Sequence, residues 1–301
     1  MANNFISYAQ KCLPIVEQKL KGESVSSFLD SNKFSFVGVK TVKVYVQSTT
    51  GIGNYDRSTG YAVGTITGNW VEKTLTQDKG ISFNVDEMDN EEEMELALRV
   101  QMADLLENHV APTVDAYTFS TIASTSGVQV ASADIVRGTT DVADLIDTAI
   151  LAVNEASGKK KRALVLSDRT YAALQKNIVR TITNDENGIN KEIETYCGMR
   201  VYTINKDRFA DSIVQYDAKT SGQTAGDYVL AAGAHYINFM IIPEGAVDKI
   251  TKLAKYKVLD AEDNRTADAY TIKYRLYYDV FVDDAVKDTI YVHKAATAFD
   301  A

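Results

Sequence analysis

The chain has 301 residues and a hydrophobic content of 45%, which is enough for the buried core of one large or two modest globular domains. Its 32 Lys and Arg residues face 41 Asp and Glu residues, and the net charge of -9 is the opposite of the basic surface of a tight nucleic-acid binder. We therefore expect only loose, non-specific contact with DNA.

The cysteines and the N-terminus give no sign of export or of a membrane anchor. Cys12 and Cys197 lie far apart and belong to no CxxC or Cys/His pattern, so neither a disulfide framework nor a zinc site is indicated. We expect two buried or inert thiols in a reducing compartment. The N-terminus lacks the apolar core of a signal peptide, and no segment approaches the roughly 18 apolar residues of a membrane span. The sequence predicts a soluble protein with no membrane contact.

Residues 1–37 are expected to form an N-terminal arm. An amphipathic helix is predicted to end near Gly22, and the Ser-rich segment ESVSSFLDSNKF that follows has only scattered hydrophobic residues. A segment of this composition buries little apolar surface, so we expect the arm to be held only weakly to any core.

Two strand-like segments on either side of a turn-rich region predict a projecting β-hairpin between about residues 42 and 77. The segment VKVYVQ begins at Val42 and the segment WVEKTLTQ begins at Trp70, and the chain between them is rich in Gly, Ser, Thr and Asn. An isolated two-stranded ribbon is only marginally stable in water. Another surface is therefore expected to cover it.

A cluster of carboxylates between Asp86 and Glu95 raises the question of a metal site. The cluster follows an alternation of Ile81, Phe83 and Val85 that predicts a half-buried strand, and it precedes apolar residues at helical spacing. Carboxylates favour the first turn of a helix, whereas adjacent helical residues fan around the axis and do not converge on one cation. The cluster therefore predicts the start of a long helix, from about residue 90 to about 122, and no metal site.

The region from about residue 140 to 242 alternates predicted helices and strands. Apolar residues from Val142 to Val153 recur at helical spacing, and the following segment ALVLS is typical of a buried strand. Ser167 or Asp168 is expected to cap the next helix. Further strands are predicted at about 199–204, 228–232 and 236–242. Together these elements predict a compact α/β lobe.

The C-terminal part is predicted to be antiparallel β-structure. Apolar residues occupy every second position from Tyr270 to Val282, which predicts a strand of about 13 residues, far longer than the usual five or six. A short turn from Asp283 to Lys287 then leads into a further strand in the segment DTIYVH.

Common catalytic and ligand-binding motifs are missing from the sequence. The strand-to-helix segment ALVLSDRTYAAL contains no phosphate-binding glycine, and His109, His235 and His293 accompany no GxSxG motif, so structural histidines are favoured. Residues 260–268 lack the glycine of a calcium loop, and the basic run 159–162 favours a solvated corner over a DNA contact. We therefore expect no enzyme, no catalytic residue, no cofactor and no bound metal.

Several segments, taken in order along the chain, resemble the major capsid proteins of tailed bacteriophages with the HK97-like fold. These segments are GNYDRSTGY (53–61), Trp70, DKGISFNVDEMD (78–89), APTVDAYTF (111–119) and RLYYDVFVDDAVKDTIYVH (275–293). The sequence departs from the related ones at Lys79 and Thr113, where those tend to have Arg and Glu. The resemblance spans nearly the whole chain.

The resemblance implies an α+β fold of the HK97-like capsid type, with an N-terminal arm, an extended β-hairpin loop, a long spine helix, an α/β axial domain and a β-rich peripheral domain. The implied boundaries are 1–37 for the arm, 38–86 for the hairpin loop and its base, 87–130 for the spine helix and peripheral domain, 131–245 for the axial domain, and 246–301 for the peripheral-domain strands and C-terminus.

The resemblance also implies a function: the chain would be a major capsid (coat) protein that self-assembles into the icosahedral head shell around the double-stranded DNA of a tailed bacteriophage. Expected partners are copies of the chain in pentamers and hexamers, a scaffolding protein, a portal and decoration proteins. No long coiled-coil segment precedes the short arm, so we expect a separately encoded scaffolding protein or an internal core. The protein is expected in the virion after assembly in the bacterial host cytoplasm.

The hairpin is implied to lie over an adjacent subunit, which would bury its exposed strands and aromatic rings only after assembly. The candidate residues for this inter-subunit contact are Tyr45, Tyr55, Asp56, Arg57, Tyr61, Trp70 and Lys73.

Two alternatives stay open. An encapsulin-like nanocompartment shell resembles phage capsids in fold but encloses cargo enzymes instead of DNA. An α/β hydrolase or transferase built on residues 130–242 is the alternative from another class, and it requires a deep pocket with convergent polar groups.

Overall fold

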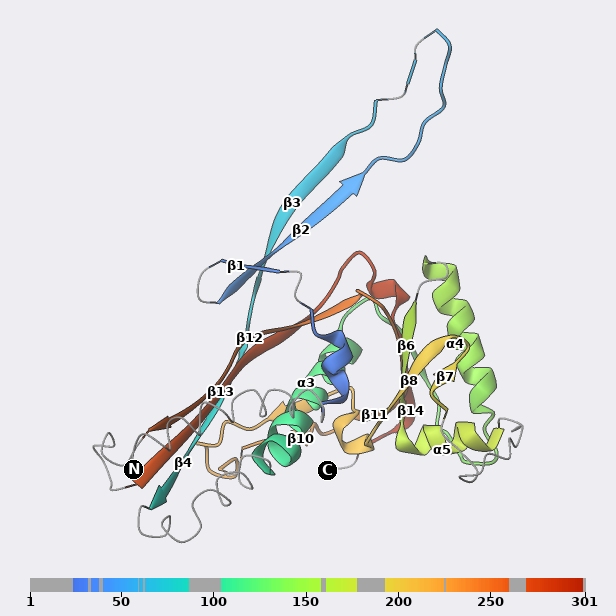
Figure 1. Ribbon diagram of the computed structural model, residues 1–301. Helices are drawn as coiled ribbons and strands as arrows, with labels where there is room; N and C mark the ends of the chain where they lie inside the picture. The colour runs from blue at the N-terminus through green and yellow to red at the C-terminus, as the bar shows by residue number, and fades with distance from the viewer. Residues whose placement is uncertain are drawn as a thin grey trace, which may run out of the picture.

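The structure is a computed structural model that describes residues 24–31, 34–37, 40–58, 60–61, 63–86, 104–157, 161–177, 193–224, 226–259 and 269–299. A long three-stranded sheet and a six-stranded sheet lie on either side of helix α3 (Ala111–Ser124), and a narrow β-ribbon projects from this body (Figure 1).

The six-stranded sheet has the strand order β5-β14-β11-β6-β8-β7. Its strands are β5 (Gln129–Ser132), β14 (Tyr291–Ala298), β11 (His235–Pro243), β6 (Arg162–Ser167), β8 (Met199–Ile204) and β7 (Thr195–Tyr196). The β5–β14 and β6–β8 pairs are parallel, and the other pairs are antiparallel. The strands predicted at 199–204 and 236–242 are therefore confirmed.

Helices α4 (Val142–Ser157) and α5 (Asp168–Asn177) cover one face of this sheet (Figure 1). The regular apolar spacing predicted for α4 is confirmed, because four of its residues are fully buried against the sheet: Val142, Ile146, Ala149 and Val153. The hydroxyl oxygen of Ser167 accepts a hydrogen bond from the backbone N–H of Thr170 at 3.3 Å. Ser167 therefore caps α5, as the sequence predicts.

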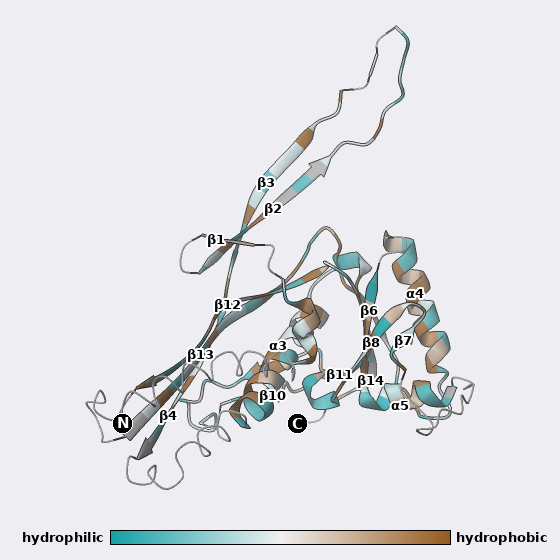
Figure 2. Cartoon of the chain, in the orientation of Figure 1, coloured by the Kyte–Doolittle hydropathy of each residue, from teal (hydrophilic) through white to brown (hydrophobic). Residues whose placement is uncertain are grey.

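Strand β6 is buried on both faces, which explains its continuous run of apolar residues. Leu164 and Leu166 pack in the cluster beneath α4 and α5, whereas Val165 packs on the opposite side with Phe119 of α3. Hydrophobic residues accordingly concentrate in α3 and in the central strands of the sheet (Figure 2).

The long sheet has the strand order β12-β13-β4. Its strands are β12 (Val247–Leu259), β13 (Ala269–Val282) and β4 (Gln77–Asp86). β13 has 14 residues, so the prediction of one unusually long strand is confirmed. One face of β13 carries Ile272, Tyr274, Leu276 and Tyr278, and these residues pack under the helical segment that contains Leu105, Leu106 and Val114.

The described part of the predicted long helix begins with a π-helical turn, η2 (Leu105–Val110), and continues as α3. The predicted start near residue 90 and most of the carboxylate cluster lie outside the described residues. In the part of the chain that is described, no group of His, Cys, Asp and Glu side chains is suited to hold a metal ion, and no helix is long and apolar enough to cross a membrane.

The remaining elements are short. They are the ribbon of β9 (Ile213–Gln215) and β10 (Tyr228–Leu230), and the 3-10 turns η3 (Lys206–Arg208) and η5 (Lys287–Thr289). The sequence predicts that the C-terminal strand belongs with the peripheral strands of 246–301. In the structure this strand, β14, is hydrogen-bonded to β11 and β5. It therefore completes the sheet of the α/β lobe instead of extending the long sheet.

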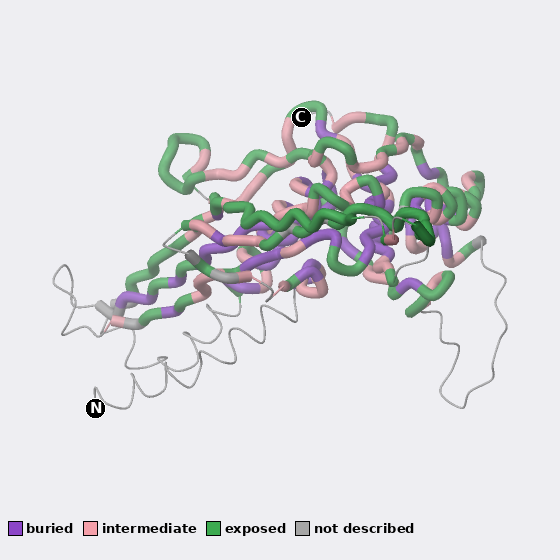
Figure 3. Tube along the Cα trace, turned by 90° about the horizontal axis from the view of Figure 1, so that it is seen from above, coloured by how far each residue is buried: buried purple, intermediate pink, exposed green. Residues whose placement is uncertain are grey.

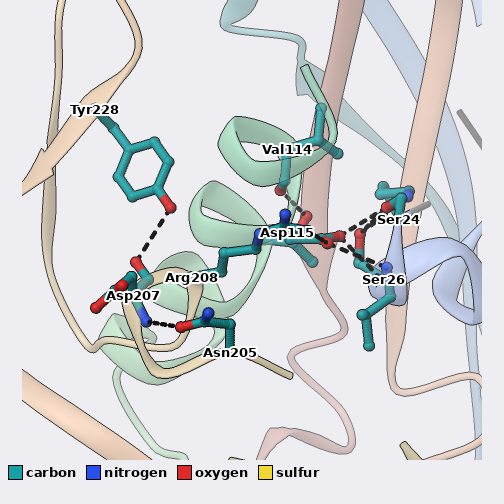
Figure 4. A network of polar contacts seen from close by, with 11 residues as sticks. Ser24, Ser26, Val114, Asp115, Asn205, Asp207, Arg208 and Tyr228 are labelled. Atoms are coloured by element: carbon teal, nitrogen blue, oxygen red, sulfur yellow. Dashed lines mark hydrogen bonds and ion pairs between the residues drawn. The ribbon is translucent and has the colours of Figure 1, made fainter. Parts of the chain in front are cut away.

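The expectation of a weakly held arm is wrong for the described segment from Ser24 to Ser31. This segment forms the turn η1 (Val25–Leu29), and Leu29 is part of the main hydrophobic core. Asp115 of α3 is fully buried and binds the segment through three hydrogen bonds (Figure 4). Its carboxylate accepts them from the Ser24 hydroxyl at 2.7 Å, the Ser26 N–H at 3.0 Å and the Val25 N–H at 3.1 Å.

We expect Asp115→Ala to lower the free energy of unfolding by about 2 kcal/mol, because three donors lose their acceptor in a site that is closed to water. Urea unfolding monitored by circular dichroism measures this loss, and hydrogen exchange at residues 24–29 is expected to accelerate. Asp115→Asn keeps one carbonyl oxygen and should cost less. An alanine variant as stable as the wild type would show that the arm segment is held by its other contacts, which include Leu29 in the core and the pairing of Lys249 with Asp30.

A buried histidine makes stability depend on pH. His293 of β14 stacks on Phe239 with ring centroids 4.8 Å apart, and its Nδ1 faces the side-chain amide of Asn238 at 3.1 Å. That amide donates to Nδ1, so the ring is neutral. Burial lowers the pKa of His293 below its ordinary value.

Because the unfolded chain binds a proton at His293 more readily than the folded chain, stability is expected to fall as pH drops through about 6.5, the ordinary pKa of histidine. His293→Phe keeps the stacking and removes the titration. The difference in unfolding free energy between wild type and H293F, measured in urea at pH 5 and pH 7.5, should shift in favour of H293F at pH 5. An unchanged difference would contradict this assignment.

Candidate inter-subunit surface

The predicted hairpin is confirmed as the projecting ribbon of β2 (Thr41–Thr49) and β3 (Ile66–Thr74), two antiparallel strands that β1 (Ser35–Val37) extends at the base. The hairpin projects from the body on one side of its root. The next strand of the chain, β4, extends from the root to the other side, along the long sheet (Figure 1).

The root of the hairpin is fixed in a small apolar cluster. Val42 and Leu75 are buried there with Ile250 and Tyr277 of the long sheet. The Tyr277 hydroxyl also donates a hydrogen bond to the Leu75 carbonyl at 3.0 Å. The direction in which the hairpin leaves the body is therefore set by packing at its root.

A buried carboxylate, Asp279 of β13, joins the hairpin root to helix α3. One oxygen accepts hydrogen bonds from the Thr76 N–H at 2.7 Å and the Thr76 hydroxyl at 2.9 Å. The other accepts from the Tyr117 hydroxyl at 2.9 Å and the Val280 N–H at 2.8 Å. Burial is the main cause that raises the pKa of Tyr117, so this phenol keeps its proton and remains a donor.

Beyond its root the ribbon is exposed along its length (Figure 3). Trp70 is 60% exposed and Tyr61 is 85% exposed. The other exposed apolar residues of the ribbon are Tyr45, Ile52, Tyr55, Val63, Ile66 and Val71. Large apolar side chains exposed together in this way commonly mark a surface that binds another molecule.

One face of the ribbon carries an aromatic surface, which we name the platform and define as Tyr45, Gly68 and Trp70. Tyr45 and Trp70 lie directly opposite one another on β2 and β3, and their ring centroids are 5.2 Å apart. The Tyr45 ring lies across Gly68, because a Cβ built there would stand 1.9 Å from the Tyr45 hydroxyl oxygen. Lys43 and Glu72 pair on the same face at 2.8 Å.

Hydrogen bonds close a turn at the tip of the hairpin. Asp56 and Gly60 exchange backbone hydrogen bonds, and the Asp56 carboxylate accepts a further one from the Ser58 N–H at 2.7 Å. Gly60 has a φ of 79°, a conformation that favours glycine. Tyr55 and Tyr61 flank the turn with ring centroids 4.9 Å apart.

The seven predicted contact residues thus fall into three groups. Tyr45 and Trp70 come together on the platform, and Tyr55, Asp56, Arg57 and Tyr61 gather at the tip. Lys73 lies at the root, where its amine donates to the Val282 carbonyl at 3.3 Å and lies 5.4 Å from the centre of the Phe281 ring. Lys73 is therefore engaged within its own chain, and contact of the seven residues with another subunit stays a prediction.

Sequence reasoning missed a second exposed apolar surface. Ile81 and Phe83 of β4 were expected on a half-buried strand, but they are 41% and 38% exposed. β4 is the edge strand of the long sheet, so one of its sides has no described strand beside it. The alternation of apolar residues predicts the strand correctly but does not tell an edge strand from a central one.

The other residues considered for chemistry lie apart from one another. His109 of η2 pairs with Asp227 at 2.7 Å, and His235 Nδ1 lies 2.9 Å from the Ala295 carbonyl, whereas His293 is buried in the sheet. The loop 260–268 and most of the run 159–162 lie outside the described residues.

Of the two expected states, buried or inert, Cys197 is not buried, because the structure shows it as a free, exposed cysteine. Partial burial of the sulfur and the nearby Asp147 carboxylate raise the pKa of Cys197, so the thiol stays protonated and unreactive near neutral pH. Cys12 lies outside the described residues.

No protein-family model and no curated protein matches the chain. Solved structures do match in fold. A structure from Gordonia phage Cozz aligns with a TM-score of 0.59 at 13% identity over 91% of this chain and 86% of that chain. The capsid structure of the cyanophage P-SCSP1u aligns with a TM-score of 0.58 at 13% identity over 87% and 85%. A virus-like particle from Pyrococcus furiosus aligns with a TM-score of 0.57 at 12% identity over 95% and 99%.

At these identities the likeness concerns the fold, and it extends over most of each chain. The predicted fold class is confirmed: the chain has the α+β fold of tailed-phage capsid proteins, the HK97-like fold.

Proposed function

We propose that the chain is the major capsid (coat) protein of a tailed bacteriophage and that its copies form the icosahedral shell around double-stranded DNA. One observation carries this proposal: a ribbon with an exposed aromatic platform is rigidly fixed at its root to a body that has a capsid fold. Such a surface is stable in water only when a partner covers it.

In this proposal the copies associate as pentamers and hexamers, and the role of the chain is structural, without catalysis or a cofactor. A scaffolding protein, a portal and decoration proteins are the further partners. Contact with the packaged DNA is loose, because the chain carries a net charge of -9. The protein belongs to the virion and is assembled in the cytoplasm of the bacterial host.

An encapsulin-like nanocompartment shell is the second candidate, because one matching particle, the virus-like particle from Pyrococcus furiosus, is not described as a phage and matches over 99% of its length. The phage proposal is preferred because the structures from Gordonia phage Cozz and the cyanophage P-SCSP1u align with slightly higher TM-scores, 0.59 and 0.58 against 0.57. The contents of the particles separate the two: nuclease-protected DNA supports the phage head, and a co-purified enzyme supports the compartment.

The test is negative-stain electron microscopy of the purified protein, alone and co-expressed with the scaffolding and portal genes of its own genome. We expect closed shells of one size in the co-expressed sample. A protein that stays monomeric in both samples, at the concentrations of an infected cell, would overturn the proposal.

A further inference from the structure

A second two-stranded ribbon lies beside helix α3. We name it the strap and define it as residues 213–217 and 226–230, which contain β9 and β10. The two strands pair with each other and with no other described strand, and β9 packs beside α3. An isolated ribbon of two strands is only marginally stable in water, so the strap depends on the surface beneath it.

The base of the strap is fixed to the sheet of the α/β lobe. The Asp211 carboxylate accepts hydrogen bonds there from the His235 N–H at 2.7 Å and from the Lys294 amine at 3.2 Å. The His235 carbonyl in turn accepts a hydrogen bond from the Asp211 N–H at 3.0 Å. Any movement of the strap therefore takes place beyond Asp211.

An ion pair fastens the far end of the strap to the helical segment before α3. His109 Nδ1 lies 2.7 Å from the Asp227 carboxylate, and the two side chains are 45% and 38% exposed. Because both reach solvent, the pair can break without leaving a buried charge. His109 belongs to the π-helical turn η2, and such turns are frequent at functional sites. A further contact of the strap is the hydrogen bond from the Tyr228 hydroxyl to the Asp207 carbonyl at 3.1 Å (Figure 4).

Three unfavourable features accompany the strap as it lies on the helix. Asp227 and Ala218 have φ angles of 61° and 58°, in the left-handed region that residues other than glycine seldom adopt. The side-chain amide nitrogen of Gln215 is buried and has no hydrogen-bond partner among the described residues. All three are relieved when the strap lifts away, because the backbone can then relax and water reaches Gln215. The ion pair therefore holds down a segment that is otherwise inclined to open.

The charge on His109 determines how strongly the ion pair holds. A protonated imidazole makes a charge-assisted hydrogen bond to the carboxylate, whereas a neutral one makes at most an ordinary hydrogen bond. Histidine is the side chain whose charge ordinarily changes between pH 5 and 8. The other charged groups of the elements packed here are Asp104, Glu107, Asp115, Asp207, Asp217, Arg208 and, on β4, Lys79. Carboxylates predominate among these groups, and they also attract a protonated His109.

We propose that the strap closes on the helix when His109 is protonated and opens when His109 loses its proton. The device belongs to the single subunit and goes beyond the proposed function, because it does not depend on the association of copies. A rise in pH should therefore open the strap. Titration of His293 acts in the opposite direction, since it lowers stability at acidic pH, so the effects of the two histidines can be told apart.

The experiment follows hydrogen exchange of the strap by mass spectrometry in the full-length, unassembled subunit at pH 5.5 and pH 8. The reporter amides are those of β9 and β10 and that of Tyr216, which donates to the Asp227 carbonyl at 2.9 Å. Protection is expressed relative to the exchange rate of an unstructured chain at the same pH. Peptides from β6 report global unfolding in the same samples and show whether each variant is folded.

Two variants separate the titration of His109 from other effects of pH. His109→Gln keeps a side chain that can form a hydrogen bond with Asp227 but does not titrate. His235→Gln is the matched control, because the Nδ1 atom of His235 lies 2.9 Å from the Ala295 carbonyl at the base of the strap. A third variant, Ala218→Gly, removes the steric penalty of the left-handed conformation and should raise the protection of the strap about threefold at both pH values.

We expect protection of the strap in the wild type to fall about fivefold between pH 5.5 and pH 8, while β6 stays protected. H109Q should show the same low protection at both pH values, and H235Q should behave like the wild type. Equal protection of the wild-type strap at the two pH values would overturn the proposal. An equal fall in H109Q would overturn it as well, because the titrating group would then be another residue.

Discussion

Removal of residues 50–69 is expected to leave a folded subunit that no longer closes into particles. The deleted segment contributes no buried residue among those described, and the root residues Val42 and Leu75 stay in place. Residues 46–49 then close a shorter hairpin. We therefore expect the deletion variant to form no particles, and its unfolding temperature to stay close to that of the wild type.

Thermal unfolding, followed by circular dichroism, measures the stability of the deletion variant. Negative-stain microscopy of the same preparation measures its assembly into particles. Gly51→Ala serves as the full-length control, because it changes the hairpin without a steric clash. A deletion variant that fails to fold would make the hairpin part of the core of its own chain. Closed particles from the deletion variant would show that the hairpin is dispensable.

Replacement of the buried carboxylate at the hairpin root is expected to cause the largest loss of stability. In Asp279→Ala, the Thr76 N–H, the Thr76 hydroxyl and the Tyr117 hydroxyl lose their shared acceptor. The Asp279 carboxylate is buried, but Thr76 is exposed, so water can replace part of what its two donors lose. Hydrogen bonds to a charged group contribute about 1.5 to 3 kcal/mol each, and we expect a total loss of about 2 to 4 kcal/mol from urea unfolding.

Two further variants test whether this loss comes from the hydrogen bonds. Asp279→Asn keeps one acceptor oxygen and should lose less than the alanine variant. Tyr117→Phe removes a single donor and should cost about 1 kcal/mol. A double-mutant cycle between Asp279 and Tyr117 that showed no coupling would contradict the shared role of the carboxylate.

The sequence predicts those parts of the fold that local patterns determine. The apolar spacing of α4, the serine cap of α5 and the long alternation of β13 each specify an element without reference to the rest of the chain. The hairpin is also predictable, because two alternating segments flank a region of turn residues.

The parts that sequence reasoning missed depend on contacts between distant residues. The arm segment looked weakly held because its anchor, Asp115, lies 91 residues away from Ser24. β14 looked peripheral because it follows β13 directly, yet its partners are β11 and β5.

In the candidate inter-subunit surface, too, the sequence predicts some features and misses others. The sequence marks the aromatic residues of the hairpin, but it does not show that Tyr45 lies across Gly68 or that Lys73 is used at the root. The exposed apolar surface of Ile81 and Phe83 was missed because their alternation is equally typical of a covered strand. Only the position of β4 at the edge of the sheet shows that these side chains are exposed.

The most direct test of the central claim is an electron cryo-microscopy map of the assembled particle at a resolution that shows side chains. The account predicts that the β2–β3 ribbon of every copy lies on a neighbouring copy, with Trp70 buried in that contact. A shell in which each ribbon folds back on its own body, or projects freely into solvent, would contradict it.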